Sequence, residues 1–339
     1  MGATNQSPSS QERGRIDALY QIAFLRQYAR QIAAINATET PHIEIITPAA
    51  RAVATGPLLL LPGSYNPPTT AHLALAESSL RAIPGSSLYL ALGTMIINKE
   101  DTERATLLDR LALLDLIARR SERLGVALTN RGLYVEQARA ARIAFPKASK
   151  LLFVIGFDKI EQIFDTRYYQ HREAALKELF ALASFLVAPR ASHAAADVAA
   201  ILSQPGNQRF QSFVHVLPFP ADYREIASSQ VRAVLQTDSF DLTSSPLAQL
   251  LPPEALFFCI ETGCYSPPQP LPDGELIDRY GIRTALIARM LDLPNDEQSA
   301  IDLQRLFLLG VSATSQGRTL RRWLTQPEGP SAQIDLRAL

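Results

Sequence analysis

The chain has 339 residues, of which 47% are hydrophobic and 19% are charged, a balance that excludes bulk disorder. Its 33 Lys and Arg residues equal its 33 Asp and Glu residues, so no global positive field favours a nucleic acid or an anionic membrane as partner. There are too few cysteines for a disulfide framework, no signal-peptide pattern, and no apolar run near the roughly 20 residues of a membrane span. We therefore expect an intracellular protein, cytoplasmic or nuclear.

Apolar residues recur at helical spacing between residues 16 and 33, which predicts an amphipathic N-terminal helix. From residue 56 onward, short apolar runs alternate with helical patterns. Strands are expected at residues 56–63, 86–93, 150–158, 183–190 and 211–220. Helices are expected at residues 72–83, 106–124, around 174–180 and after His193. The alternation predicts an α/β fold, a Rossmann-like doubly wound parallel sheet with helices on both faces.

A proline-rich stretch, Ser-Pro-Pro-Gln-Pro-Leu-Pro at residues 266–272, is the clearest linker in the sequence. Beyond it, Asp273 can cap a helix of a small helical unit. We therefore predict an N-terminal helical extension (residues 1–55), a central α/β domain (56–265), and the linker with a C-terminal helical unit (266–339). Because every expected strand precedes the linker, we expect the central domain to fold without the residues that follow it.

The sequence LLLLPGSYNPPTTAH, residues 58–72, joins an expected strand to an expected helix. Gly63 allows a sharp turn and lets backbone amides approach a ligand. A helix beginning near Thr69 or Thr70 would aim its free N–H groups and its positive dipole end at the edge of the sheet, where phosphate binds well. His72, in the first turn, could donate to a phosphoryl oxygen. A proline-ended loop with a surface histidine would contain the same residues, so this stretch alone leaves both interpretations open.

A second stretch, Ile-Ala-Ser-Ser-Gln-Val-Arg at residues 226–232, again places hydroxyl groups at an expected helix start. Ser228 or Ser229 can cap that helix, and Arg232 follows one turn later on the same side. Alone, the pattern is most often a capped helix with a solvated arginine. Two such stretches in one α/β chain favour a site for a polyphosphate ligand.

Together, GSYNPPTTAH and IASSQVR resemble the paired motifs of the nucleotidylyltransferase superfamily, and within it the nicotinamide/nicotinate mononucleotide adenylyltransferases. Thr69 in place of the first histidine of the first motif is similar to the eukaryotic-type branch. The resemblance spans about residues 58–235 and implies transfer of an adenylyl group from ATP to nicotinamide mononucleotide (NMN) or its nicotinate analogue. The products would be NAD, or its nicotinate analogue, and pyrophosphate.

The resemblance also implies roles for individual residues. The matching catalytic positions are His72, Arg232, Ser228 and Lys99. The matching ATP-binding positions are Gly63, Ser64, Tyr65, Thr69, His72, Gly156, Asp158, Arg190, Ser228, Ser229 and Arg232. The positions that would bind the acceptor are Lys99, Arg110, Tyr168 and Tyr169. No residue is assigned to a protein-held metal, and Mg²⁺ is expected on the phosphates of ATP.

The chain departs from the family most at the residue that stacks on the acceptor base. The family usually has a tryptophan shortly after a strand that ends in Gly-x-Asp, which corresponds to residues 156–158 of this chain. Here the sequence Thr-Arg-Tyr-Tyr follows at residues 166–169, and the one tryptophan of the chain, Trp323, lies in the tail. Tyr169 or Tyr168 can substitute as the stacking ring.

Smaller departures are Tyr65 for the family's Phe, and Ala227 and Ser229 for its Ser and Thr. ATP and a mononucleotide are the expected partners, and a homo-oligomer is compatible with the sequence. Two alternatives stay open: a related nucleotidylyltransferase with another phosphorylated acceptor, and a nucleotide-binding or slowly ATP-hydrolysing protein of the same fold.

Overall fold

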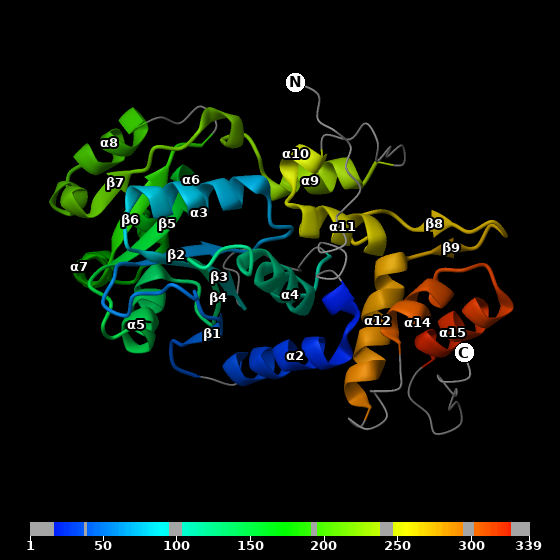
Figure 1. Cartoon of the computed structure of the whole chain (residues 1–339). Coiled ribbons are helices and arrows are strands. Elements are labelled where there is room, and N and C mark those ends of the chain that lie inside the picture. The colour runs from blue at the N-terminus through cyan, green and yellow to red at the C-terminus, as the bar shows by residue number, and fades with distance from the viewer. Residues whose placement is uncertain are drawn as a thin grey trace.

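The computed structural model describes residues 17–36, 39–94, 104–190, 195–237, 247–293 and 302–326 (Figure 1). The strands of the main sheet are β1 (Ile43–Thr47), β2 (Leu58–Gly63), β3 (Ser87–Gly93), β4 (Leu124–Thr129), β5 (Leu151–Gly156), β6 (Ser184–Ala188) and β7 (Val214–Val216). The helices that precede β5 in the chain are η1 (Asp17–Tyr20), α2 (Ile22–Asn36), α3 (Thr70–Ala82), α4 (Leu107–Ala118) and α5 (Tyr134–Ala144).

The helices that follow β5 are α6 (Phe157–Phe164), η2 (Thr166–Tyr168), α7 (Arg172–Leu182), α8 (Ala195–Ser203), η3 (Gln208–Phe213), η4 (Ala221–Tyr223) and α9 (Ser228–Leu235). The C-terminal part holds α10 (Leu247–Leu250), α11 (Pro253–Thr262), the hairpin of β8 (Gln269–Pro270) and β9 (Leu276–Ile277), α12 (Arg279–Asp292), α14 (Leu303–Gly310) and α15 (Ser315–Thr325).

The main sheet has the strand order β1-β4-β3-β2-β5-β6-β7. All neighbouring pairs are parallel except β1 with β4, which is antiparallel. The chain moves outward from β2 through β3 to β4, and then returns to the other side of β2 to form β5, β6 and β7. The strand order therefore reverses between β2 and β5, which is the place where open α/β sheets bind ligands.

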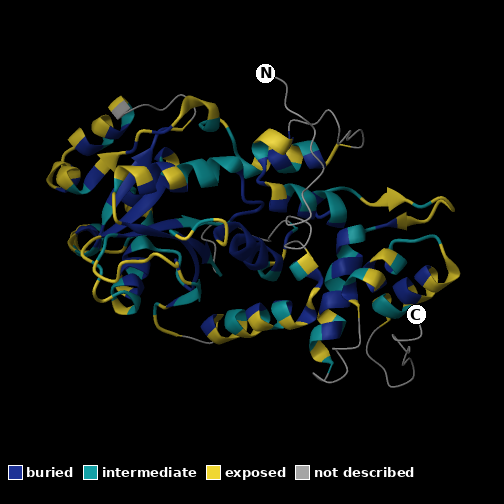
Figure 2. Cartoon of the chain, in the orientation of Figure 1, coloured by how far each residue is buried: buried dark blue, intermediate teal, exposed yellow. Residues whose placement is uncertain are grey.

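Most strands of the sheet are buried, as their dark colour in Figure 2 shows, and their apolar side chains pack on both faces. Leu59 and Leu61 belong to the cluster that includes α2, α4 and α12, whereas Leu58 and Leu60 belong to the cluster that includes α5, α6 and α7. Successive side chains of a strand point to opposite faces. The four consecutive leucines are thus the sequence of a strand buried on both sides.

The doubly wound parallel fold expected from the sequence is confirmed, with five of its strands. These expected strands are β2, β3, β5, β6 and β7. β1 and β4 are two further strands that the sequence pattern did not predict. The segment before residue 56 therefore contributes an edge strand to the sheet in addition to its helix.

The C-terminal part differs from the expectation in two respects. Asp273 does not cap a helix, because residues 269–277 form the β8–β9 hairpin and Asp278 accepts from Gly281 N at the start of α12. Residues on the two sides of the proline-rich linker also pack together, because Ile277 and Leu286 beyond it share one buried cluster with Leu111 before it. The three-part division into residues 1–55, 56–265 and 266–339 stays a prediction.

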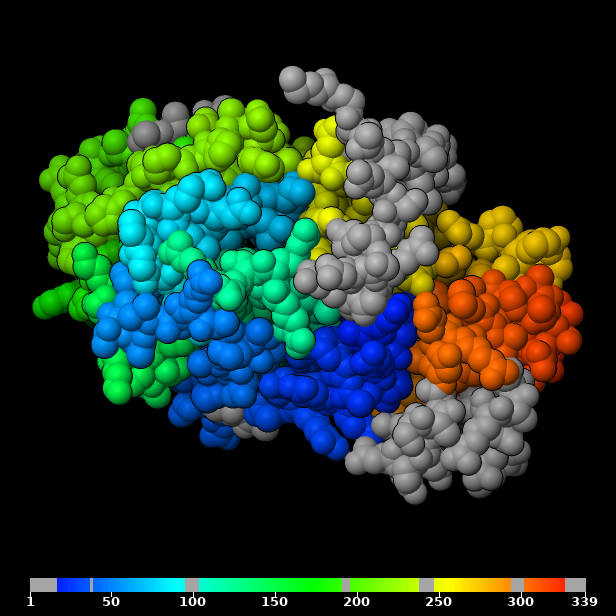
Figure 3. All heavy atoms as spheres, viewed as in Figure 1, coloured from blue at the N-terminus to red at the C-terminus, as the bar shows by residue number. Residues whose placement is uncertain are grey.

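The N-terminal and C-terminal helices lie against each other, as the blue and orange surfaces of Figure 3 show. The Arg26 guanidinium of α2 donates to the carbonyls of Leu291 (2.9 Å) and Leu293 (2.7 Å) at the end of α12. None of the helices in the described ranges is both long enough and apolar enough to cross a membrane.

Candidate functional site

A cavity of about 620 Å³ opens at the carboxyl-terminal edge of the sheet. Its lining includes the last residue of five strands, together with Arg190 two residues after β6. These strand ends are Gly63 of β2, Gly93 of β3, Thr129 of β4, Gly156 of β5 and Ala188 of β6. Because parallel strands end at the same edge, residues from distant parts of the sequence meet there. The cavity straddles the switch point between β2 and β5.

The β2–α3 loop, residues 64–69, borders one side of this cavity and contributes Ser64 to its lining. A Cβ atom at Gly63 would lie 3.0 Å from two ring carbons of Tyr65, so glycine permits the close turn. Tyr65 itself has a φ of +48°, a region that costs a non-glycine residue roughly 1–3 kcal/mol. Its side chain is buried and its hydroxyl donates to the Leu61 carbonyl. The surrounding structure therefore holds this loop in one conformation.

Three side chains donate to backbone carbonyls of the β2–α3 loop. Arg110 of α4 donates to Ser64 O (2.8 Å), Arg232 of α9 to Asn66 O (2.7 Å), and the Ser228 hydroxyl to Pro67 O (2.7 Å). The two sequence motifs, far apart in the chain, are thus joined directly at the cavity. Ser228 is the first residue of α9 rather than its cap, because Ala227 occupies the N-cap position, so the expected capping role is wrong.

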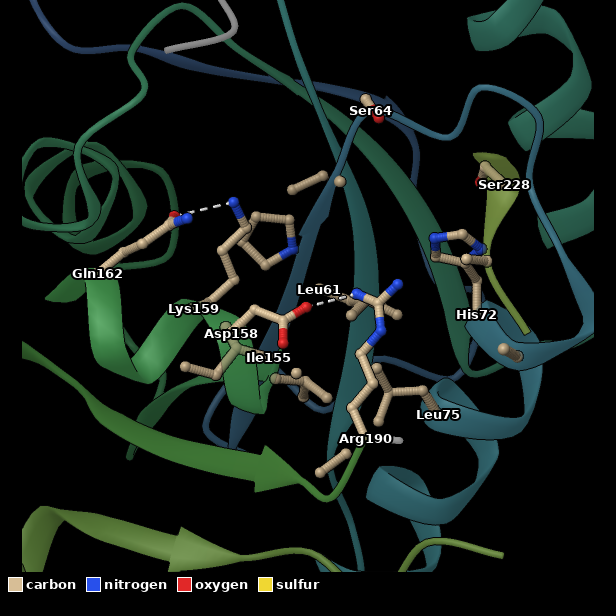
Figure 4. A pocket seen from close by; sticks show the side chains of 18 of the residues that line it. Leu61, Ser64, His72, Leu75, Ile155, Asp158, Lys159, Gln162, Arg190 and Ser228 are labelled. Atoms are coloured by element: carbon tan, nitrogen blue, oxygen red, sulfur yellow. Dashed lines mark hydrogen bonds and ion pairs between the residues drawn. The ribbon is translucent and has the colours of Figure 1, made fainter. Parts of the chain in front are cut away.

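His72 lies in the first turn of α3 and lines the cavity (Figure 4). Its Nδ1 accepts from the Thr69 backbone N–H at 3.0 Å. A ring nitrogen that accepts from an amide cannot carry a proton, so in the neutral ring the proton is on Nε2. Burial, together with a smaller effect of the Arg190 charge, lowers the pKa of His72 to about 4. At neutral pH, His72 is therefore an uncharged Nε2–H donor.

The opposite side of the cavity is formed by the start of α6 and the end of β6. Asp158 and Arg190 form an ion pair of 2.9 Å there, and Lys159 donates to Gln162 at 3.0 Å (Figure 4). Tyr169 also lines the cavity, and its hydroxyl donates to Ile163 O (2.8 Å), which fixes the position of the ring. Acid, base and aromatic groups thus face the motifs across the cavity.

Most of the residues predicted from the sequence meet in the lining of this cavity. They are Gly63, Ser64, His72, Gly156, Asp158, Tyr168, Tyr169, Arg190, Ser228, Ser229 and Arg232. Tyr65, Thr69 and Arg110 are not in the lining: all three are buried, and they support the β2–α3 loop or His72 through hydrogen bonds. Lys99 lies outside the described residues.

A group of lining residues between the end of β4 and the first turns of α5 was not predicted from the sequence. They are Thr129, Gly132, Leu133, Tyr134 and Gln137. They follow β4, the strand that was not expected, so no strand end directed attention to them. The run Gly-Val-Ala-Leu-Thr ending in Asn130 is the signal that could have identified both the strand and its polar end.

Within the described ranges, no three His, Cys, Asp or Glu residues come together in a way that could hold a metal ion. The two described cysteines, Cys259 and Cys264, are buried, and burial raises the pKa of both thiols. Cys259 lies within α11.

The family model for cytidylyltransferase-like proteins matches residues 60–234, which is more than half of the 339 residues. The chain belongs to the cytidylyltransferase-like family. This finding confirms the nucleotidylyltransferase resemblance and makes the protein a nucleotidyltransferase. Both motifs at the cavity of this cytidylyltransferase-like chain, the β2–α3 loop and the start of α9, fall inside the matched region.

Two solved structures similar to the chain are complexes of the Plasmodium falciparum nicotinic acid mononucleotide adenylyltransferase. The complex with APC has 15% identity and a TM-score of 0.44, and the complex with NaAD has 17% identity and a TM-score of 0.45. Each match covers 62% of this chain and 97% of the other. A search of curated protein sequences finds no significant match.

Proposed function

We propose that this protein transfers the adenylyl group of ATP to nicotinamide mononucleotide or its nicotinate analogue, releasing pyrophosphate. An oxygen of the mononucleotide 5′-phosphate would attack the α-phosphorus, and the bond from that phosphorus to the oxygen bridging to the β-phosphate would break. The observation that supports the proposal best is the direct joining of the two motifs, by Arg232 to Asn66 O and Ser228 to Pro67 O, at one cavity.

The chemistry requires positioning and charge stabilisation more than proton transfer. A phosphate monoester is already ionised at neutral pH, so the attacking oxygen needs no general base. The start of α3 directs its dipole toward the triphosphate, and Arg232 supplies a positive charge for the β- and γ-phosphates. His72 donates its Nε2–H to the α-phosphate, where negative charge develops in the transition state.

A neutral His72 suits this position. Because Nδ1 accepts from the Thr69 amide, a ring flip that turned Nδ1 toward the cavity in place of Nε2 would break that hydrogen bond. The donor is therefore present in the same orientation before ATP arrives, and little reorganisation accompanies the reaction. ATP phosphates beside the ring would favour its protonated form, so bound nucleotide should raise the pKa of His72 above its value in the empty site.

We also propose that Mg²⁺ enters the site on the triphosphate. Mg²⁺ keeps several water ligands and often binds through substrate phosphates with one or two carboxylates. Asp158, whose carboxylate lines the cavity on the side opposite the motifs, pairs with Arg190 at 2.9 Å. Phosphate oxygens and water would therefore supply most of the ligands, and the metal would neutralise charge on the leaving pyrophosphate.

For the acceptor, the proposal assigns Tyr168 and Tyr169 to the base and Lys99 and Arg110 to the phosphate, as the family resemblance implies. The ring of Tyr169 is half-buried, lines the cavity and is fixed through its hydroxyl, so it offers an aromatic face at a defined place. Arg110 acts in part through Ser64 O, so its effect on the acceptor would include the position of the β2–α3 loop.

The test is incubation of the purified protein with ATP, Mg²⁺ and either NMN or its nicotinate analogue, with separation of products by chromatography. Formation of a dinucleotide together with an equal amount of pyrophosphate is the expected result. Parallel reactions with CTP and with other phosphorylated acceptors identify a sibling enzyme of the same family. ATP binding without any pyrophosphate-coupled product would contradict the proposal and favour a nucleotide-binding or slowly ATP-hydrolysing protein.

A further inference from the structure

The β2–α3 loop also accepts a hydrogen bond from a residue beyond the family-matched region, which ends at residue 234. Tyr265, three residues after the end of α11, donates from its hydroxyl to Asn66 Oδ1 at 2.6 Å. Both side chains are buried, with 5% of Tyr265 and 4% of Asn66 exposed. Burial raises the pKa of Tyr265 well above its ordinary value, so the phenol keeps its proton and remains the donor.

Asn66 connects this contact to the nucleotide motifs. Its backbone carbonyl accepts from Arg232, and its side chain accepts from Tyr265. One loop residue is therefore fixed from two sides, by α9 at the cavity and by the C-terminal part behind it. Displacement of Asn66 would move the carbonyl that orients the Arg232 guanidinium.

A second contact reaches the loop through α4. The Tyr280 hydroxyl of α12 donates to Asp109 Oδ2 (2.7 Å), and Arg283 donates to Asp109 Oδ1 (2.8 Å). All three side chains are buried. The next residue after Asp109 is Arg110, whose guanidinium donates to Ser64 O in the loop. The start of α4 is thereby fixed in the direction that brings Arg110 to the loop.

The buried Arg283–Asp109 ion pair is expected to contribute little to the net free energy of folding. Removing two charges from water costs about as much as their attraction returns, and apolar residues of similar size would often serve as well. In some proteins such pairs are retained because they fix one geometry rather than because they add stability. In this chain the geometry that the pair fixes is the approach of Arg110 to Ser64 O.

We propose that Tyr265, Tyr280 and Arg283, here called the C-terminal brace, are positioning residues for the phosphate-binding conformation of the β2–α3 loop. The inference rests on the proposed function in so far as it takes ATP as the ligand. The brace touches no substrate. It acts by fixing Asn66 and Arg110, and through them the backbone of the loop and the Arg232 guanidinium.

The experiment measures the affinities of the full chain for ATP with Mg²⁺ and for adenosine by isothermal titration calorimetry. Adenosine carries the base and sugar but no phosphate, so it reports on the rest of the cavity. Tyr265→Phe removes one hydroxyl and leaves the ring in place. We expect its Kd for ATP to rise about two- to tenfold, the range of one net hydrogen bond, with an unchanged Kd for adenosine. Tyr280→Phe should change the ATP affinity in the same direction.

Tyr28→Phe is the matched control. The Tyr28 hydroxyl is also buried and also bonds a carboxylate of α4, but that carboxylate is Asp115, near the far end of the helix from Arg110. This variant should bind both ligands as the wild type does, even if its thermal stability falls. A general loss of stability therefore cannot imitate the expected result.

An unchanged ATP affinity in Tyr265→Phe, or an equal loss for ATP and adenosine, would overturn the inference while leaving the proposed function intact. The same holds if Tyr28→Phe weakens ATP as much as Tyr265→Phe does. Failure of the wild-type chain to bind ATP would overturn the proposed function, and the inference with it. Because binding is measured without turnover, the identity of the acceptor does not affect the result.

Discussion

The two sides of the cavity differ in how firmly their residues are held. The phosphate wall consists of Ser64, His72, Ser228 and Arg232. Ser64 belongs to the β2–α3 loop, and the other three side chains are hydrogen-bonded to that loop. Within the loop, Asn66 and Thr69 are 4% and 0% exposed. The α6 wall, consisting of Asp158, Lys159, Tyr169 and Arg190, includes an ion pair whose side chains are 50% and 45% exposed. The hydrogen bonds that hold the phosphate wall to this loop are half-buried, whereas Asp158 and Lys159 of the α6 wall are exposed.

The difference indicates a division of labour between the walls. Stabilising a transition state requires donors that do not move when charge develops, and under the proposed function the phosphate wall would supply them. Recognising a base and sugar tolerates side chains that rearrange as the ligand arrives. We therefore expect changes in the phosphate wall to alter the rate of the chemical step or the binding of the triphosphate, and changes in the α6 wall to alter the binding of base and sugar.

The largest effect is expected for His72→Ala. Loss of an oriented donor at the α-phosphate should lower kcat by about two to three orders of magnitude, with a modest change in ATP affinity. The measurement is steady-state dinucleotide formation at saturating ATP, with ATP affinity determined separately. An unchanged kcat would remove His72 from the chemistry, and an effect on affinity alone would erase the proposed difference between the walls.

Arg232→Ala should raise the Kd for ATP by about tenfold or more, because a charged donor to phosphate contributes about 1.5–3 kcal/mol. AMP, which lacks the β- and γ-phosphates, should lose much less. Arg232→Lys is the control, since it keeps the charge but not the forked geometry. Titration calorimetry with both nucleotides gives the comparison, and equal losses for ATP and AMP would contradict the placement of Arg232 at the distal phosphates.

On the α6 wall, Tyr169→Ala should raise the KM for the mononucleotide by up to about tenfold and leave the KM for ATP nearly constant. The cause would be loss of an aromatic face for the acceptor base. Tyr169→Phe retains the ring and loses the hydroxyl that donates to Ile163 O, so it should stay close to the wild type. A matching loss in both variants would show that the hydroxyl, rather than the ring, matters.

The smallest effect is expected for the exposed ion pair. Asp158→Asn should change the free energy of unfolding by less than about 1 kcal/mol, because solvent screens the pair. Asp109→Asn provides the scale, since unpairing the buried Arg283 should cost about 3 kcal/mol or more. Chemical denaturation measures both. Similar losses in the two variants would mean that the α6 wall is held as firmly as the interior.

The sequence allowed the phosphate wall to be predicted because local rules determine it. A strand ending in Gly63 and a helix starting after Thr69 follow from turn and capping preferences, and α3 does begin at Thr70. The contact of Ser228 with Pro67 O could not be predicted, because the two residues are 161 positions apart and meet only through the strand order. The family resemblance supplied that pairing instead.

The lining from β4 and α5 was missed for a related reason. The apolar pattern of α4 leads almost directly into β4, and the turn between them contains no glycine or proline to mark the boundary. Without β4, the position of Tyr134 at the sheet edge had no basis. The C-terminal brace could not be predicted from the sequence pattern either. Its residues lie on both sides of the proline-rich stretch, which predicts a linker between two units rather than contacts between them.

The antiparallel strand β1 has a consequence for handling the protein. It covers the outer side of β4, with Ile43 opposite Thr129 and Ile45 opposite Ala127. A chain that began at residue 56 would leave a row of β4 backbone N–H and C=O groups open beside apolar side chains. Such an edge pairs readily with strands of other molecules and promotes aggregation. The same truncation removes α2, whose Leu25 and Tyr28 belong to the buried core, so insolubility of the shortened chain would reflect the loss of both elements.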